Sequence, residues 1–312
     1  MFSFAQPKKN GWLSLCFATD RFDLAHVVRE AGARPVVQLL ESYRRTGDDS
    51  AVLGQLQRQK RLANYRCTHL LADGEYQMLQ VEAPNVPPAE LKEAVRWRLK
   101  DMIAYPVEAA TVDVLDIPGT GQGGGRPRSL FAVAAANDLV ASRMGVFQEA
   151  KLGLEAIDIP ELAQRNVAAL FEEENRGLAF FNCDDSGSLL TLTYQGELLA
   201  ARRIEITARQ LEEADEERRR QLYERIGLEL QRSLDNFERA YSFVSISKVC
   251  LSPCAFAPGL LEYIRDYAYV PAESVDLASV MDFSAVPELR DPSLQSRRLA
   301  VIGAALRTEG GA

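Results

Sequence analysis

The sequence predicts a duplicated α/β fold in which two domains face each other across a central cleft. Length is the first observation, because 312 residues suffice for two domains of roughly 100–200 residues each. The second observation is a repeated pattern: a three-strand meander starts near Trp12 and starts again near Leu178, about half a chain later. The third is that helical and strand patterns alternate after each meander, as they do in layered α/β architectures.

The first half of the chain begins with apolar and alternating segments bounded by turn residues, which predict strands at 12–17, 22–28 and 36–43. After this meander the periodicity switches repeatedly between helix and strand. The elements expected there are helix 50–62, strands 67–71 and 76–81, helix 88–103, strands 111–117 and 130–135, a helix capped by Asn137, strand 154–159 and helix 160–171.

The second half repeats the meander and then continues with a long helix. Its strands are expected at 178–183, 189–194 and 197–206. Thr207 caps the helix, with Gln210 at the capping-box position, and the apolar stripe extends the helix to about residue 243. The later elements are strand 248–251, helix 259–268, a short strand near 269–270, a loop-rich stretch over 276–292 and helix 295–306.

These elements divide the chain into residues 1–172 and residues 173–307. The first domain carries an inserted subdomain at about 66–150, and residues 308–312 form a frayed tail. A duplicated meander followed by helices is the layout of actin-like, or ribonuclease-H-like, two-domain proteins. In that layout the two meander turns hold phosphate, because the backbone N–H groups of a tight turn form an anion-binding nest.

Composition excludes several classes of function. The chain is 47% hydrophobic and 26% charged, as soluble globular proteins are. Its net charge of −8 argues against a nucleic-acid-binding face and against attachment to anionic lipid by charge alone. No apolar run reaches about 18 residues, and no signal-peptide pattern follows the first residues, so we expect a cytoplasmic protein.

The five cysteines and two histidines offer little for metal or redox chemistry. Cys16, Cys67 and Cys183 lie in apolar runs, as buried free thiols do. Cys250 and Cys254 are four residues apart, but no second cysteine or histidine pair accompanies them. Zinc therefore has too few ligands, and a metal or redox role for these two cysteines is the weakest alternative.

Two other features invite a functional interpretation. The glycine-rich segment 119–128 lacks the Lys-Ser/Thr pair of a phosphate-binding loop and precedes a strand, so we expect a flexible hairpin tip. Trp97 lies off the apolar stripe of its helix. It is either an exposed partner-binding residue or a residue packed against another part of the molecule.

Three segments resemble pilus-assembly proteins of the PilM and MshI type. They are residues 89–107, including AELKEAVRW and KDMIAYPV; residues 227–239, GLELQRSLDNFER; and residues 299–307, LAVIGAALR. The glycine-rich insert and the start of the chain resemble the MshI branch, which serves mannose-sensitive haemagglutinin (MSHA) pili. The resemblance implies an actin-like ATPase fold in a cytoplasmic protein that reaches the inner membrane by docking on the cytoplasmic tail of a PilN-like partner.

The resemblance also implies nucleotide-binding residues. In the first turn they are Thr19 and Asp20. Asp20 could hold magnesium through water, but the turn has no glycine to let the backbone approach phosphate closely. A plain hairpin turn is the alternative.

The second turn is Asp184-Asp185-Ser186-Gly187. Ser186 and Gly187 could cradle a phosphate while Asp184 or Asp185 faces a metal ion, although these four residues also suit a plain turn.

The family's nucleoside-binding helix matches Glu229, Arg232 and Ser233. The alternative for Glu229 is a boundary carboxylate paired with Arg225, four residues earlier. Segment 251–259 lacks the glycine pair with which the family closes its pocket.

Two functions are compatible with these residues. The first is a docking scaffold whose cleft is degenerate or regulatory and binds either ATP with magnesium or no cofactor. The alternative is an active Mg-ATP-hydrolysing ATPase, with Asp20 and the second-turn aspartates on the metal.

Overall fold

The computed structural model describes residues 8–45, 47–120 and 127–308. The predictions for the tip of the glycine-rich segment, residues 121–126, and for the tail at 309–312 lie outside these residues. Within the described residues, no helix is both long enough and apolar enough to cross a membrane.

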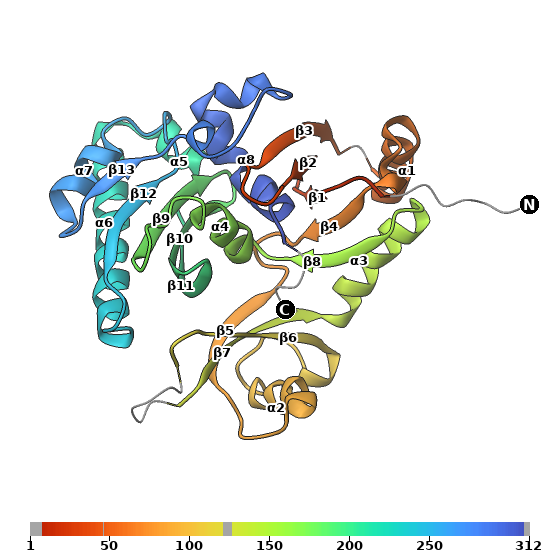
Figure 1. Cartoon of the computed structure of the whole chain (residues 1–312), viewed down its shortest axis with the longest axis horizontal. Coiled ribbons are helices and arrows are strands. Elements are labelled where there is room, and N and C mark those ends of the chain that lie inside the picture. Colours follow the sequence, from red (N-terminus) through yellow and green to blue (C-terminus); the bar gives the residue numbers. More distant parts are fainter. Residues whose placement is uncertain (1–7, 46, 121–126, 309–312) are drawn as a thin grey trace, which may run out of the picture.

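Two five-stranded sheets form the body of the molecule (Figure 1). Their orders, β3-β2-β1-β4-β8 and β11-β10-β9-β12-β13, are equivalent. Each joins an antiparallel meander to parallel strands, which confirms the duplication. The first sheet contains β1 (Trp12–Phe17), β2 (Arg21–Val28), β3 (Val36–Arg44), β4 (Arg66–Leu70) and β8 (Leu154–Asp158). The second contains β9 (Gly177–Asp184), β10 (Gly187–Tyr194), β11 (Glu197–Ile204), β12 (Ile246–Leu251) and β13 (Ala272–Ser274).

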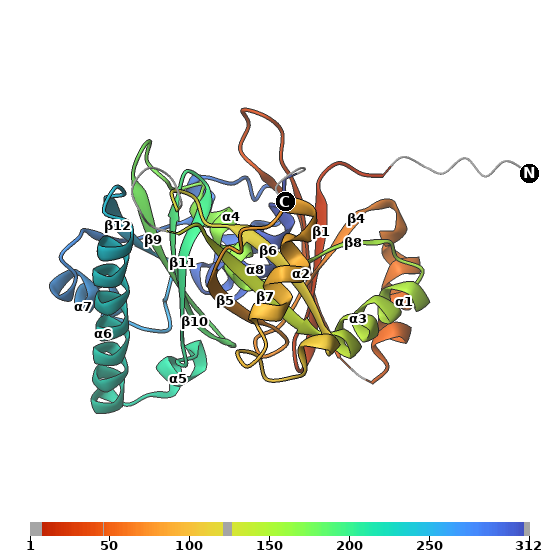
Figure 2. The ribbon, with the colours of Figure 1, turned by 90° about the horizontal axis from the view of Figure 1, so that it is seen from below.

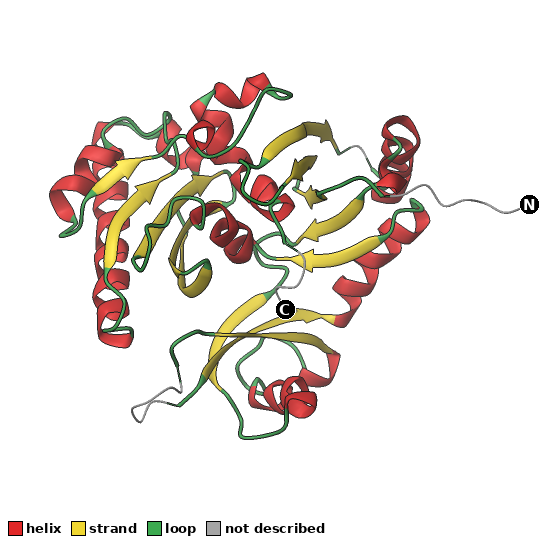
Figure 3. Ribbon diagram, viewed as in Figure 1, coloured by secondary structure: helices red, strands yellow, loops and turns green. Residues whose placement is uncertain are grey.

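Helices cover both sheets and also fill the space between them (Figures 2 and 3). Outside the first sheet lie α1 (Asp49–Lys60) and α3 (Asn137–Glu149), and outside the second lie α6 (Glu216–Ala240) and α7 (Leu260–Tyr267). Between the sheets are α4 (Pro160–Ala168) and α8 (Pro292–Ala305). α8, from the end of the chain, packs on β1, β2 and β4, whereas α4, from the first half, packs on β9, β10 and β11. Each half therefore contributes a helix to the sheet of the other.

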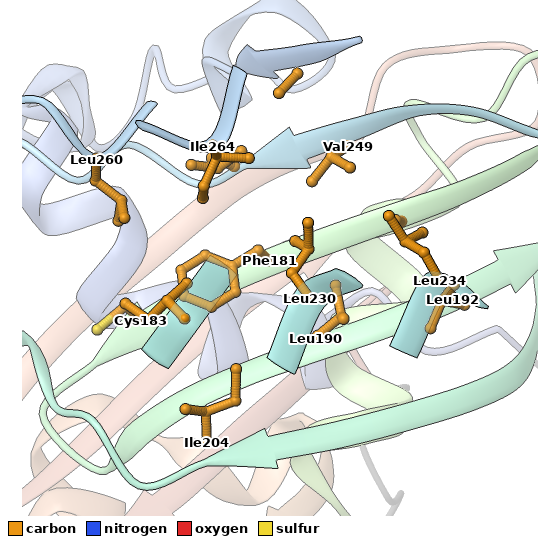
Figure 4. Close-up of a cluster of buried hydrophobic side chains, with 14 of the residues drawn as sticks. Phe181, Cys183, Leu190, Leu192, Ile204, Leu230, Leu234, Val249, Leu260 and Ile264 are labelled. Atoms are coloured by element: carbon orange, nitrogen blue, oxygen red, sulfur yellow. The ribbon is translucent and has the colours of Figure 1, made fainter. Parts of the chain in front are cut away.

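Hydrophobic burial on one face fixes the position of α6. Leu230 and Leu234 of α6 lie over Phe181, Leu190 and other strand residues of the second sheet (Figure 4). Burying apolar area of this kind is the main favourable contribution to folding. The opposite face of the helix is charged, as expected for an amphipathic surface helix.

A third, smaller sheet interrupts the first half between β4 and β8. It consists of β5 (Gln77–Glu82), β6 (Ala110–Asp116) and β7 (Ser129–Ala136), in the order β5-β7-β6. One face is covered by α2 (Leu91–Arg98), whose Val95 is fully buried against β7. This sheet falls within residues 66–150 (Figure 1), but β4, which lies in the same range, belongs to the first sheet, so the inserted subdomain and its bounds stay a prediction. The domain boundary at 172/173 stays a prediction.

Four local predictions are wrong. The helix expected at 88–103 is a 3₁₀ turn at Pro88–Glu90 followed by α2, and Asp101 has a left-handed φ of 74°, which does not continue a helix. The helix expected from Thr207 to residue 243 is broken after α5 (Ala208–Glu213), because Ala214 is extended and the Asp215 side chain caps α6. The Thr207–Gln210 capping box is confirmed.

The other two errors concern a cap and a strand. Ala136 is the cap residue of α3, because Asn137 is already helical and its side chain accepts a hydrogen bond from Thr111. The short strand expected near 269–270 is β13, which lies at Ala272–Ser274.

His69 on β4 predicts a measurable pH dependence of stability. It is fully buried against Phe17 and Phe147, and its Nδ1 lies 3.1 Å from the Leu15 carbonyl oxygen. Burial, reinforced by the positive charge of Arg143, lowers its pKa from 6.5 to about 4. Because the folded pKa lies below the unfolded value, the contribution of His69 to stability is fully present above pH 6.5 and is lost as the pH drops toward 4.

We expect His69→Phe to remove roughly 2–3 kcal/mol of the stability loss between pH 7 and pH 4.5. Urea unfolding of both proteins at the two pH values measures this difference. An equal loss in both proteins would show that groups other than His69, such as the carboxylates and His26, cause the pH dependence.

Candidate functional site

A cleft of about 1030 Å³ opens between the two sheets, and both meander turns line it. The sequence-predicted residues that line it are Thr19, Asp20, Asp184, Asp185 and Ser186. Gly187 lines an adjoining pocket of about 200 Å³ together with Ser186. The structure therefore brings together the two turns, which are more than 160 residues apart in the sequence.

The first turn is closed by its own hydrogen bonds. The Ala18 amide donates to the Arg21 carbonyl at 2.9 Å, and the Arg45 amide donates to the Asp20 carbonyl at 2.8 Å. The Arg45 guanidinium also donates to the Ala18 carbonyl at 3.0 Å and pairs with the Asp49 carboxylate. This segment is thus a tight hairpin turn held by a neighbouring arginine.

The second turn already holds a carboxylate. Asp184 Oδ1 accepts hydrogen bonds from the Ser186 amide at 2.8 Å and from Ser186 Oγ at 2.5 Å. Burial raises the pKa of Asp184, although these bonds and one from the Gly187 amide lower it in part. The N–H groups that could cradle a phosphate are therefore engaged by Asp184.

An arginine–carboxylate network crosses the cleft. Arg21 of β2 donates through Nε to Asp23 at 3.0 Å and through Nη2 to Asp185 Oδ2 at 3.4 Å. Arg297 of α8 reaches Asp185 Oδ1 at 3.4 Å and Glu212 at 2.8 Å. Asp185 thus connects the second turn to β2 of the first sheet and to α8, which lies between the sheets.

The donor set does not fit a divalent cation bound directly by the chain. Asp184 is engaged by its own turn, and Asp185 is engaged by two arginines. In the described part of the chain, no group of three or more His, Cys, Asp or Glu side chains is arranged to hold a metal ion. Asp20, whose side chain is 75% exposed, could contact a hydrated magnesium ion only through water.

Glu229, Arg232 and Ser233 of α6 are not among the residues that line the cleft. Glu229 pairs with Arg202 of β11 at 2.8 Å and with Arg232 at 3.4 Å, and Ser233 Oγ donates to the Glu229 carbonyl. The structure therefore separates these three residues from the two turns. Glu229 is thus a paired carboxylate, as in the alternative interpretation, but its partners are Arg202 and Arg232 instead of Arg225. Arg202 comes from a strand, which helical spacing does not reveal.

The metal or redox alternative has no support in the geometry. Cys250 belongs to the apolar core between the two sheets, whereas Cys254 packs against the core under α6. Both are free cysteines, and burial raises the pKa of each thiol to about 12. Neutral thiols in two separate cores do not form a reactive or metal-binding pair.

Trp97 is 53% exposed, and its indole N–H donates to Glu93 on the same helix. The alternative that Trp97 packs against another part of the molecule is therefore wrong. Met102, in the turn that follows α2, is also exposed, at 47%. α2 and the turn that follows it thus present two large apolar side chains to solvent.

Sequence reasoning missed most of the residues that line the cleft, among them the charged side chains of Arg21, Arg297 and Glu212. Arg21 adjoins Asp20 in the sequence and could have been included on that ground. Glu212 and Arg297 come from α5 and α8, which are separated by more than 80 residues. No regular spacing in the sequence indicates that these two residues meet, because only the packing of α8 between the sheets brings them together.

Comparison with known proteins supports the fold. No protein-family model and no curated protein matches the sequence. The chain is similar to a solved structure described as a PilM-PilN type IV pilus biogenesis complex, with a TM-score of 0.69, 19% identity and coverage of 96% of this chain and 99% of that chain. It is also similar to a Bacteroides thetaiotaomicron protein of unknown function with an actin-like ATPase fold, with a TM-score of 0.50, 10% identity and coverage of 93% and 99%. With its duplicated sheets and the cleft between them, the chain has the actin-like ATPase fold.

Proposed function

We propose that the chain is a PilM/MshI-type scaffold of a type IV pilus assembly complex, which docks the cytoplasmic tail of a PilN-like inner-membrane protein. The observation that carries this proposal is the similarity, over nearly the whole of both chains, to the PilM-PilN complex. The protein would be cytoplasmic and would reach the inner membrane through its partner. Assignment to the MSHA branch rests on the sequence resemblance.

The cleft is the second part of the proposal, as a degenerate or regulatory nucleotide site. The second-turn amides bind Asp184, and the first turn lacks glycine. Both features weaken close backbone contact with a phosphate chain. The cleft residues therefore favour a docking scaffold over an efficient ATPase. In such a scaffold, any ATP that binds would regulate docking.

An active Mg-ATP-hydrolysing ATPase remains the second candidate, because both turns line one cleft. In that case Asp20 and the second-turn aspartates would act on magnesium. Hydrolysis would then require Asp20, so phosphate release by the purified protein should stop in Asp20→Ala. Release that persists in this variant would come from another site or another enzyme.

Co-purification tests the docking function. The chain should be retained by a PilN-like protein expressed with its cytoplasmic tail and should be lost when that tail is deleted. Unchanged retention without the tail would contradict docking on the tail.

Trp97 is the residue that we propose for partner contact. Exposed tryptophans are frequent energetic hot spots of interfaces, and their truncation costs about 2 kcal/mol or more. We therefore expect Trp97→Ala to weaken tail binding more than tenfold. Tyr269→Ala is the matched control, since Tyr269 is similarly exposed, at 51%, but lies beyond α7. Equal affinities of wild type and Trp97→Ala would remove Trp97 from the interface.

A further inference from the structure

We propose that Arg21 and Arg297 form a metal-independent polyphosphate site in the cleft and that Asp185 is its internal competitor. The inference rests on the proposed regulatory cleft and names the chemistry by which that cleft would recognise its ligand. The carboxylate of Asp185 lies between the guanidinium groups of these two arginines.

The geometry of the pair suits one phosphoryl group. Arg21 approaches Oδ2 of Asp185 and Arg297 approaches Oδ1, each at 3.4 Å. The two guanidinium groups thus flank a single anionic group that has one oxygen toward each. Planar guanidinium groups bind phosphate oxygens and carboxylate oxygens in the same way. A terminal phosphoryl group can therefore take the place of the Asp185 carboxylate.

Both arginines are held in place by other contacts. Arg21 donates through Nε to Asp23, which is almost fully buried and also accepts a hydrogen bond from Ser42. Arg297 pairs with Glu212 at 2.8 Å, and its guanidinium lies over the Phe256 ring, 5.6 Å from the centroid. Displacing Asp185 would leave these anchors intact, so the site is preorganised for an anion.

The remaining charges of the cleft explain why Asp185 matters. Its lining residues include more carboxylates than arginines. Arg45 and Arg143 are paired with Asp49 and Glu75, respectively. An incoming polyphosphate therefore meets a surplus of negative charge, and Asp185 competes for the two arginines that would bind it. Removing the Asp185 charge relieves both effects.

Calorimetric titration with sodium tripolyphosphate and with ATP, each in EDTA and in excess magnesium, tests the proposal. We expect Asp185→Asn, which keeps the shape of the side chain, to bind tripolyphosphate in EDTA about three- to tenfold more tightly than wild type. Arg21→Gln and Arg297→Gln should each weaken binding about tenfold or more. Asp113→Asn and Arg220→Gln are matched controls, since both residues form exposed ion pairs outside the cleft.

Three results would overturn the proposal. One is wild-type binding that requires magnesium and weakens in Asp185→Asn, as for a carboxylate that serves the metal. Another is the absence of binding in Asp185→Asn at millimolar ligand, with near-UV circular dichroism showing a native fold. The third is ATP binding without tripolyphosphate binding, since the nucleoside would then carry recognition. Tail binding, measured on the same preparations, separates these failures from a failure of the docking function.

Discussion

Gly303→Ala is expected to lower the free energy of unfolding by about 3 kcal/mol. Gly303 lies where α8 crosses α4, and a Cβ atom there would come within 2.1 Å of the Ala163 carbonyl oxygen and 2.7 Å of its carbonyl carbon. These are backbone atoms, so they cannot rotate away as a flexible side chain would. The two central helices would have to separate, and the sheets packed on them would shift.

Gly145→Ala is the matched control in an open helical position. Gly145 lies within α3, and in the described part of the structure a Cβ atom there would meet nothing within 4 Å beyond the backbone of its own helix. Alanine has the higher helix propensity, so this variant should be unchanged or more stable by up to about 1 kcal/mol. Urea unfolding of the two variants measures the contrast. Equal stabilities would mean that α4 and α8 are not in close contact in solution.

Glu161→Ala is expected to destabilise the protein by roughly 3–5 kcal/mol. The Glu161 side chain, on α4, is only 3% exposed and receives hydrogen bonds from Arg203 Nε at 2.9 Å and from the Tyr76 hydroxyl. Arg203 also pairs with Asp73 at 3.3 Å. Burial, together with the Glu161 charge, raises the pKa of Tyr76 well above its usual value, so the phenol stays protonated as a donor.

The network joins three parts of the fold. Tyr76 directly precedes β5 of the small sheet, Glu161 belongs to the central helix α4, and Arg203 belongs to β11 of the second sheet. Removing Glu161 leaves a partly buried guanidinium without its main partner. Glu197→Ala is the control, because Glu197 pairs with Arg165 while 53% exposed and should cost at most about 1 kcal/mol. Similar losses in the two variants would contradict the central role of Glu161.

Local signals in the sequence were sufficient to predict the two meanders. Apolar alternation and turn residues act over a few positions, and the turn at Gln195-Gly196 has positive φ at both residues, as a tight hairpin requires. The convergence of the two turns was predictable from the duplication. By contrast, the break between α5 and α6 was missed because Asp215 lies within a charged run that is compatible with a continuous helix.

The chemistry of the cleft was less predictable than its position. Both second-turn aspartates line the cleft, but their partners depend on tertiary packing. Arg297 reaches Asp185 only because α8 lies between the sheets, and Glu229 meets Arg202 only because β11 runs beside α6. Pairings of this kind have no fixed spacing in the sequence.

Binding of the partner tail to the purified chain tests the docking function most directly. A labelled peptide of the PilN-like cytoplasmic tail would be titrated with wild type and Trp97→Ala, and fluorescence anisotropy would report complex formation. We expect saturable one-to-one binding to the wild type, with an affinity more than tenfold weaker in Trp97→Ala. A correctly folded wild-type protein that shows no saturable binding at about 100 μM, far above the dissociation constants of most specific complexes, would contradict the proposed docking function.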